Sequence, residues 1–132
     1  MSSMLNLKWK TEYALLLINY LSTQKTFKSL ESITNDLNIP YPFSSQIAAT
    51  LAKNSILESK EGRGGGYILS KPLKQIRLST IMDIFEKKPH IVPCQNAQFK
   101  CNWDSKCGHK NFFSDKLAKI MAKEFNKWNL KI

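Results

Sequence analysis

The chain has 132 residues, 42% of them hydrophobic and 23% charged, which is typical of a folded protein with a modest core and one additional long helix. Lys and Arg outnumber Asp and Glu by 20 to 10, and the resulting net charge of +10 favours an anionic partner, most often a nucleic acid. No apolar run reaches the roughly 18 residues of a membrane span and no export signal is apparent, so we expect no membrane partner and a cytoplasmic location.

Two helices are predicted at the start of the chain. Apolar residues recur at three- and four-residue steps between residues 9 and 21, and one face is expected to carry Tyr13, Leu16, Leu17, Tyr20 and Leu21. Ser29 can cap a second, shorter helix, because its hydroxyl can accept a hydrogen bond from a free backbone N–H. That helix is expected to end before Pro40, since the residue before a proline avoids helical geometry.

A third helix is predicted from about Pro42, where the missing N–H costs nothing. Phe43, Ile47 and Leu51 share its inner face. The opposite face carries small and amide side chains and one lysine: Ser45, Gln46, Ala49, Ala52 and Lys53. A solvated helix would normally carry Glu and Lys there, so this face suits close approach to a polar surface. Two short helices joined by a tight turn make a helix-turn-helix.

A glycine-rich tip lies between two short β-like runs at residues 56–60 and 67–69. The tip has the sequence EGRGGG at residues 61–66, and the pattern predicts a β-hairpin, which after a helix-turn-helix makes a winged helix. A phosphate-binding loop is disfavoured, because the Gly-Lys-Ser/Thr ending is absent and a strand follows instead of a helix. Arg63 can enter a narrow minor groove, and the glycines let the backbone approach DNA closely.

The surface predicted to contact DNA combines the third helix with this wing. Gln46 can pair with adenine, and Ala49 can touch a thymine methyl group. Lys71 and Lys74 are expected to join the other lysines as phosphate contacts, which position the protein without reading sequence. The expected DNA-binding residues are Ser44, Ser45, Gln46, Ala49, Lys53, Lys60, Arg63 and Gly64.

Two more helices are predicted after the wing. Ser79 is expected to cap the fourth, with Ile81, Ile84 and Phe85 along one side. The last, over residues 112–128, has lysines on one face and a wide apolar stripe on the other. The stripe could cover the chain's own core. Its apolar surface is larger than that core needs, however, and this predicts a helix-mediated homodimer. The expected interface residues are Phe113, Leu117, Ile120, Met121, Phe125 and Trp128.

All three cysteines, Cys94, Cys101 and Cys107, lie in one stretch, with six and then five residues between them. A packed core would scatter its cysteines, whereas grouped thiolates hold a metal or an oxidisable centre. These intervals are too long for a zinc knuckle and fit a loop around an iron–sulfur cluster of four or two irons. A structural zinc and a disulfide switch stay open as alternatives. The candidates for a fourth ligand are His90, Asp104, His109 or an acid elsewhere.

A family resemblance is carried by the segments IPYPFSSQI at residues 39–47, LAKN and ILES at residues 51–59, and GRGGGY at residues 62–67. Together with the placement of the cysteine loop, they resemble the IscR/NsrR family of bacterial winged-helix regulators (the Rrf-two superfamily), over nearly the whole chain. The resemblance implies a dimeric transcription factor, usually a repressor, whose DNA affinity depends on an iron–sulfur cluster. It makes the three cysteines cluster ligands, the helix over residues 42–54 the major-groove reader, Arg63 the wing contact and the last helix the dimer interface.

The fourth ligand differs between two branches of this family. Regulators of cluster biogenesis place a histidine three residues after the last cysteine, but here that position is Lys110 and His109 comes one residue early. The nitric-oxide-sensing branch instead uses an acid on the first helix of the partner subunit. The segment KTEYA at residues 10–14 resembles that helix, so we favour Glu12 over His109.

The sequence therefore predicts a mainly α protein with a small β-hairpin, a winged helix-turn-helix with a long C-terminal dimerisation helix. The expected divisions are a DNA-binding domain over residues 1–88, a cysteine loop over 89–111 and a dimerisation helix over 112–132, together forming one compact domain. The expected function is a dimeric repressor of a palindromic operator, controlled by a cluster that senses nitric oxide, oxidants or iron. The alternative is a zinc-stabilised or disulfide-switched regulator or interaction module. No Ser-His-Asp or paired-carboxylate arrangement suggests an enzyme.

Overall fold

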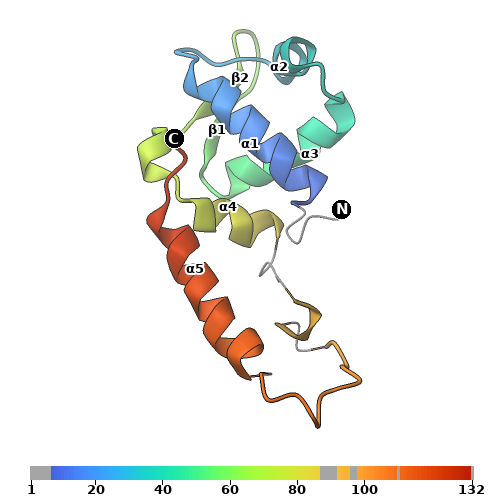
Figure 1. Cartoon of the computed structure of the whole chain (residues 1–132). Helices are drawn as coiled ribbons and strands as arrows, with labels where there is room; N and C mark the ends of the chain where they lie inside the picture. The colour runs from blue at the N-terminus through green and yellow to red at the C-terminus, as the bar shows by residue number, and fades with distance from the viewer. Residues whose placement is uncertain (1–6, 87–91, 96–97, 110, 132) are drawn as a thin grey trace. The chain divides into compact units, whose positions relative to one another are not determined.

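The computed structural model describes residues 7–86, 92–95, 98–109 and 111–131. It divides into two compact units (Figure 1). The hairpin unit comprises Lys8–Ile76 and Asn129–Ile132, and the cysteine unit comprises Met1–Leu7 and Arg77–Trp128.

Three helices open the hairpin unit: α1 (Trp9–Ser22), α2 (Leu30–Leu37) and α3 (Tyr41–Lys53). The predicted cap of α2 is confirmed, because the Ser29 hydroxyl accepts a hydrogen bond of 3.2 Å from the backbone N–H of Ser32. Asn38 ends α2 in the left-handed conformation, with φ of 53°, and Pro40 precedes the first residue of α3. Asn38 and Pro40 thus limit the connection between α2 and α3 to a short turn.

The core of the hairpin unit is formed by apolar faces on all three helices. On α1 the buried apolar side chains are Ala14, Leu17, Ile18 and Leu21, each at most 1% exposed. The remaining buried apolar residues of this unit are Leu30, Ile33, Ile47, Ala48, Leu51, Ile56, Leu57 and Ile76. Tyr20 on α1 donates a hydrogen bond to the Asp36 carboxylate on α2, and this bond raises the pKa of Tyr20, because deprotonation would break it.

The hairpin consists of β1 (Leu57–Lys60) and β2 (Gly66–Leu69), paired antiparallel with Leu57 opposite Leu69 and Lys60 opposite Gly66. A short 3₁₀ turn, η1 (Leu73–Gln75), follows β2. At the other end of the unit's sequence, the backbone N–H of Leu130 donates to the carbonyl of Ile76 at 2.9 Å. The C-terminal residues thus return to the hairpin unit.

The cysteine unit contains α4 (Leu78–Phe85), the 3₁₀ turn η2 (Pro93–Gln95), the π-helix η3 (Phe112–Leu117) and α5 (Ala118–Lys127). The end of α5 is tied to the start of α4. The Arg77 guanidinium donates to the Asn126 carbonyl at 2.6 Å, and the Leu78 N–H donates to the Trp128 carbonyl at 2.8 Å. These bonds satisfy carbonyls that the end of a helix leaves without partners.

The prediction of a mainly α protein with a small β-hairpin is confirmed. Three details differ. Ser79 does not cap α4; it lies inside the first turn, and its hydroxyl donates to the Asn126 side chain at 3.1 Å. Phe43 is 47% exposed and does not lie on the inner face: its ring packs edge-on against Trp9, which is itself 42% exposed, with centroids 5.0 Å apart. The last helix begins as the π-helix η3 and becomes regular only at Ala118.

None of the helices in the described ranges is long and apolar enough to cross a membrane.

Two neighbouring leucines on α1 allow a test of this core. Leu17 is fully buried and Leu16 is 42% exposed. We expect Leu17→Ala to lower the free energy of unfolding by about 2 to 5 kcal/mol, through lost apolar contacts and the resulting cavity. The matched Leu16→Ala variant should cost less than about 1 kcal/mol, since it leaves no buried void. Urea unfolding followed by circular dichroism measures both, and equal losses would contradict the assigned faces of α1.

Candidate DNA-binding surface and cysteine loop

The outward face of α3 carries the predicted reading side chains. Gln46, Ala49 and Lys53 are all exposed, and Ser45 is half-buried beside them. Positions three and four residues apart lie on one side of a helix, so these groups share a surface. Ser44 differs from the expectation: its side chain is fully buried, and its hydroxyl donates to the Pro40 carbonyl at 2.8 Å. Ser44 therefore packs inside the unit and does not reach this surface.

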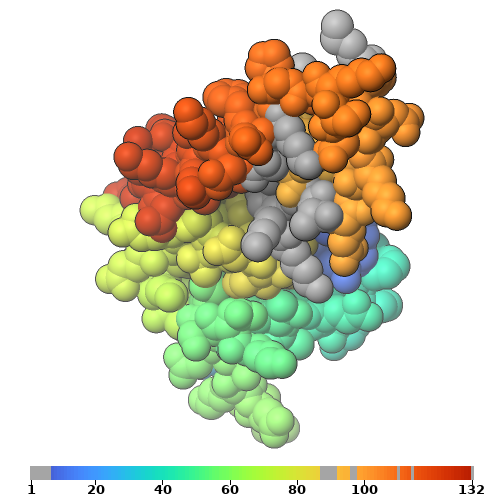
Figure 2. Space-filling view, turned by 90° about the horizontal axis from the view of Figure 1, so that it is seen from below, coloured from blue at the N-terminus to red at the C-terminus, as the bar shows by residue number. Residues whose placement is uncertain are grey.

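The tip of the hairpin presents Arg63 to solvent (Figure 2, light green, beyond the green atoms of α3). Gly62 and Gly64 flank it with φ of 86° and 74°, values that other residues adopt only with strain. A Cβ atom at either glycine would have no neighbour within 4 Å, so the tip is open on both sides. The glycines thus provide the tight reversal that exposes one arginine.

The root of the hairpin is attached to the start of α2. The Lys28 N–H donates to the Tyr67 carbonyl at 3.0 Å, and the Tyr67 N–H donates to the Lys28 carbonyl at 2.8 Å. A Cβ atom on Gly66 would lie only 2.0 Å from the Lys28 carbonyl oxygen, so only glycine allows this approach. Sequence reasoning missed this attachment, although a glycine directly before a β-like run is a sign of a close backbone contact.

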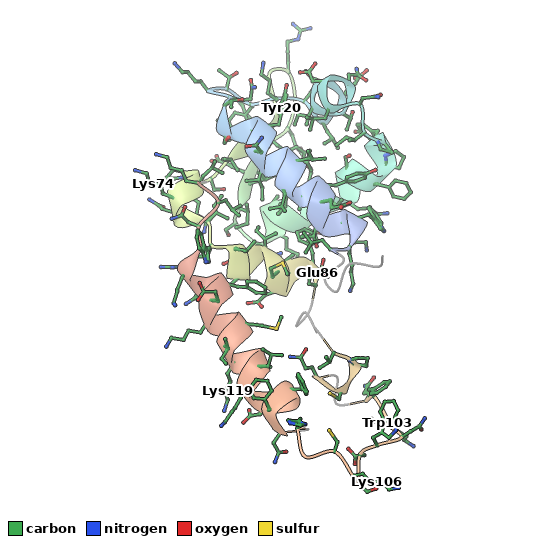
Figure 3. The ribbon with its side chains drawn as sticks, in the orientation of Figure 1. Tyr20, Lys74, Glu86, Trp103, Lys106 and Lys119 are labelled. Carbon is green, nitrogen blue, oxygen red and sulfur yellow. The ribbon has the colours of Figure 1, made fainter. Side chains whose placement is uncertain are left out.

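Lysines surround these elements in the hairpin unit. Lys53 at the end of α3 and Lys60 at the end of β1 are exposed, and the Lys60 ammonium lies 5.8 Å from the centre of the Phe27 ring. Lys71 and Lys74, also expected to contact phosphates, lie beside and within η1. Figure 3 shows Lys74 on one side of α1, with the start of α3 on the other side.

The cysteine loop of the cysteine unit is held by short-range turns. Cys94 lies in η2 and is half-buried, as is Cys101, whereas Cys107 is exposed, and all three are free thiols. The Trp103 N–H donates to the Cys101 sulfur at 3.4 Å, and the Cys107 N–H donates to the Trp103 carbonyl at 2.8 Å. The Trp103 side chain is 71% exposed at the outer edge of the loop (Figure 3).

The donor set of this loop fits an iron–sulfur cluster in its chemistry. Three soft thiolates are the usual protein ligands of such clusters, and an N–H directed at a cysteine sulfur is the kind of bond that tunes them. Among the residues that the structure describes, no three His, Cys, Asp or Glu side chains are gathered closely enough to hold a metal ion. The loop would therefore have to draw its thiols together when it binds a metal.

The expected fourth ligands have different surroundings. Glu12 is exposed in the first turn of α1, in the hairpin unit. His109 is exposed in the cysteine unit, with its ring centre 6.5 Å from that of Phe113, and Asp104 is exposed within the loop. His90 lies outside the described residues, as does Lys110.

The residues expected at a dimer interface are unevenly exposed. Met121 is buried, and its sulfur accepts a contact of 3.9 Å from the Gln95 side-chain amide of the cysteine loop. Ile120 is 56% exposed and Trp128 is 58% exposed. Phe112, which was not among the expected interface residues, is 44% exposed. Phe113, Leu117 and Phe125 are half-buried. One face of η3 and α5 thus contributes to its own unit while other apolar groups stay on the surface.

The arrangement of α1–α3 and the hairpin is that of a winged-helix transcriptional regulator. CymR (YrzC), the global cysteine regulator of B. subtilis, has a similar fold, with a TM-score of 0.71 at 19% identity over 96% of this chain and 94% of that one. IscR from T. potens is similar with a TM-score of 0.68 at 20% identity, covering 96% of this chain and 83% of its own.

The chain belongs to the Rrf2 family, described as an iron-dependent transcriptional regulator, whose family model matches residues 7–131. It is 27% identical to the HTH-type transcriptional regulator NsrR of Shouchella clausii over 82% of this chain and 74% of that protein. It is also 31% identical to the HTH-type transcriptional regulator IscR of Cereibacter sphaeroides over 63% of this chain and 56% of that protein. The resemblance carried by the wing and the cysteine loop is confirmed, and the protein is a regulator and not an enzyme.

The attachment of the wing allows a test of local steric constraint. Gly66→Ala should lower the free energy of unfolding by more than about 2 kcal/mol, because its Cβ would collide with the Lys28 carbonyl. Gly64→Ala is the matched control: it also has positive φ but open space, and should cost only about 1 kcal/mol. Thermal and urea unfolding measure both. Similar losses for the two variants would show that the backbone conformation alone, and not the contact with Lys28, requires Gly66.

Proposed function

We propose that the protein is a dimeric DNA-binding repressor whose affinity for a palindromic operator is controlled by an iron–sulfur cluster on the Cys94–Cys101–Cys107 loop. The observation that carries the proposal is three free thiols on one accessible loop, in a chain whose other unit presents an exposed reading helix and wing. The proposal places the protein in the cytoplasm, where thiols stay reduced and DNA is available.

The reading role follows from what α3 and the wing expose. Gln46 can make a paired hydrogen bond to an adenine edge, and Ala49 can contact a thymine methyl group beside it in the major groove. Lys53 and Lys60 would neutralise phosphates, and Arg63 would enter the adjoining minor groove. A homodimer would place two such surfaces on half-sites about one helical turn or more apart, which is why a palindromic operator is expected.

The sensing role follows from the loop. Its three thiolates would hold the cluster, whether four-iron or two-iron, and Glu12 of the partner subunit would complete the ligand set, with His109 as the alternative. When bound, the cluster supplies a centre that reacts with nitric oxide or oxidants. The loop's own part is to gather its thiolates, and η3, which follows it, connects any such rearrangement to α5 and the exposed apolar side chains proposed as the dimer interface.

The named relatives support this reading, since NsrR and IscR are both HTH-type transcriptional regulators and the family is described as iron-dependent. A second candidate is a regulator switched by its thiols alone. The free, accessible state of Cys101 and Cys107 favours it, and S. aureus CymR, whose fold is similar at 20% identity with a TM-score of 0.70, has been solved in an oxidised form. In that case a disulfide would replace the cluster as the signal.

DNA reading can be tested with a duplex selected by the protein from a random library. Gln46→Ala should cost about 1 to 3 kcal/mol of binding free energy on that duplex and relax the preference at one base pair. Lys53→Ala should weaken binding to all duplexes alike and reduce the salt slope by about one unit. Lys119→Ala on α5 removes the same charge away from the proposed surface and should bind as the parent does. Unchanged selectivity of Gln46→Ala would rule out α3 as the reader.

The cluster can be tested on protein purified without oxygen. The parent should be coloured and contain iron and sulfide, and exposure to nitric oxide should lower its operator affinity by at least about tenfold, or about 1.4 kcal/mol. Replacing the three cysteines by serine should abolish the iron and the response, whereas Ser105→Ala, in the same loop, should preserve both. Iron-free protein whose binding follows thiol oxidation would favour the second candidate. A nitric oxide response that survives in the triple serine variant would refute the cysteine loop as the sensor.

A further inference from the structure

A hollow of about 530 Å³ opens on the hairpin unit, a volume in the range of pockets that bind small molecules. Its walls come from the end of α1, from the end of β2 and from the turn around η1, with one residue from the C-terminal segment. All of these elements belong to the hairpin unit, so the site is complete within that unit. Neither the proposed DNA contacts on α3 and the wing tip nor the thiols contribute to it.

The lining combines apolar walls with an entirely cationic set of charges. Leu21, Ile68 and Leu73 are among the apolar residues, and Leu21 is 1% exposed. The charged lining residues are Lys71, Lys74 and Lys131, and no Asp or Glu among the described residues lines the hollow. Within the described part of the chain, no carboxylate forms an ion pair with any of the three ammonium groups.

Some of the neutral polar groups of the lining are hydrogen-bonded within the chain. The Ser22 hydroxyl donates to the Asn19 carbonyl at 2.6 Å, and the Gln24 side-chain amide donates to the Thr23 hydroxyl at 3.1 Å. The Ser70 N–H donates to the Ile56 carbonyl at 3.0 Å. The lysine ammonium groups are the charged groups that a ligand would meet, and they can only donate hydrogen bonds.

We propose that this hollow binds a small amphipathic carboxylate, with its apolar body against the leucine and isoleucine side chains and its head group among the three lysines. An apolar wall favours burial of hydrocarbon, and a site with several cations and no acid favours an anion over a neutral or cationic ligand. DNA contact explains the hollow less well, because a phosphate contact needs no apolar wall and Lys74 lies across α1 from the start of α3 (Figure 3).

The position of the hollow would let a bound carboxylate restrain the wing. Two of its walls, the end of α1 and the end of β2, belong to elements that hold the wing in place. A ligand that bridges them would restrain the root of the wing while leaving its tip free. The proposal goes beyond the cysteine-dependent control and does not depend on it.

Octanoate is a suitable probe, because it has a flexible apolar chain and one carboxylate. Isothermal titration of the full chain should give saturable binding with one site per chain, and octanol at the same concentration should bind at least about tenfold more weakly. A variant with Lys71, Lys74 and Lys131 all replaced by alanine should also lose at least about tenfold in affinity for octanoate. The matched control replaces Lys116, Lys119 and Lys123 by alanine, which removes the same charge from the cysteine unit, and should bind octanoate as the parent does.

Three outcomes would overturn the proposal. The first is octanol that binds as tightly as octanoate, and the second is a Lys71/Lys74/Lys131 variant that keeps the parent's affinity. The third is an absence of octanoate binding combined with a loss of operator affinity in that variant, which would assign these lysines to DNA phosphates. A Leu73→Trp variant, which fills the hollow and keeps every charge, should also abolish octanoate binding, and a cooperative unfolding transition confirms that it folds.

Discussion

The pair of backbone hydrogen bonds between Lys28 and Tyr67 is the constraint on which the geometry of the proposed DNA-binding surface depends. It joins β2 to the residue just before the cap of α2, and α2 leads into α3 through a turn set by Asn38 and Pro40. The wing and the reading helix are therefore held through one common element. Because backbone atoms make the contact, it constrains position more tightly than side-chain packing alone would, and it leaves Arg63 exposed at the tip.

The core of the hairpin unit and the cysteine loop differ in how much buried surface holds them, and this suits different roles. The hairpin unit has fully buried apolar faces on three helices, which favour a single stable arrangement. The cysteine loop is held by local turns around Trp103 and exposes Cys107, so little buried surface opposes its rearrangement. Segments with few buried contacts open at low free-energy cost, as a ligand-responsive loop requires.

Much of this arrangement could be predicted from the sequence. Apolar periodicity, and the prolines and glycines that end helices or form turns, determine structure over only a few residues. The cap at Ser29, the helix stop near Pro40 and the hairpin around Arg63 all follow from nearest neighbours in the chain. Errors arose where a distant partner decided the outcome. Phe43 packs against Trp9 on another helix, and Ser79 donates to the Asn126 side chain at the end of α5. The attachment of Gly66 to Lys28, and the clustering of Lys131 with Lys71 and Lys74, also join positions far apart in sequence, and a local pattern does not identify the partner.

The π-helix η3 stands between the last cysteine and α5, and it has a consequence for how this protein can vary. A π-helical turn holds one residue more than an α-helical turn, so it accommodates a single inserted residue without breaking the helix. Loss of one residue within η3 would let this segment become a regular α-helix, and α5 would keep the faces that it has now. The stretch between the last cysteine and α5 can therefore change in length by one residue without turning the apolar side chains of α5.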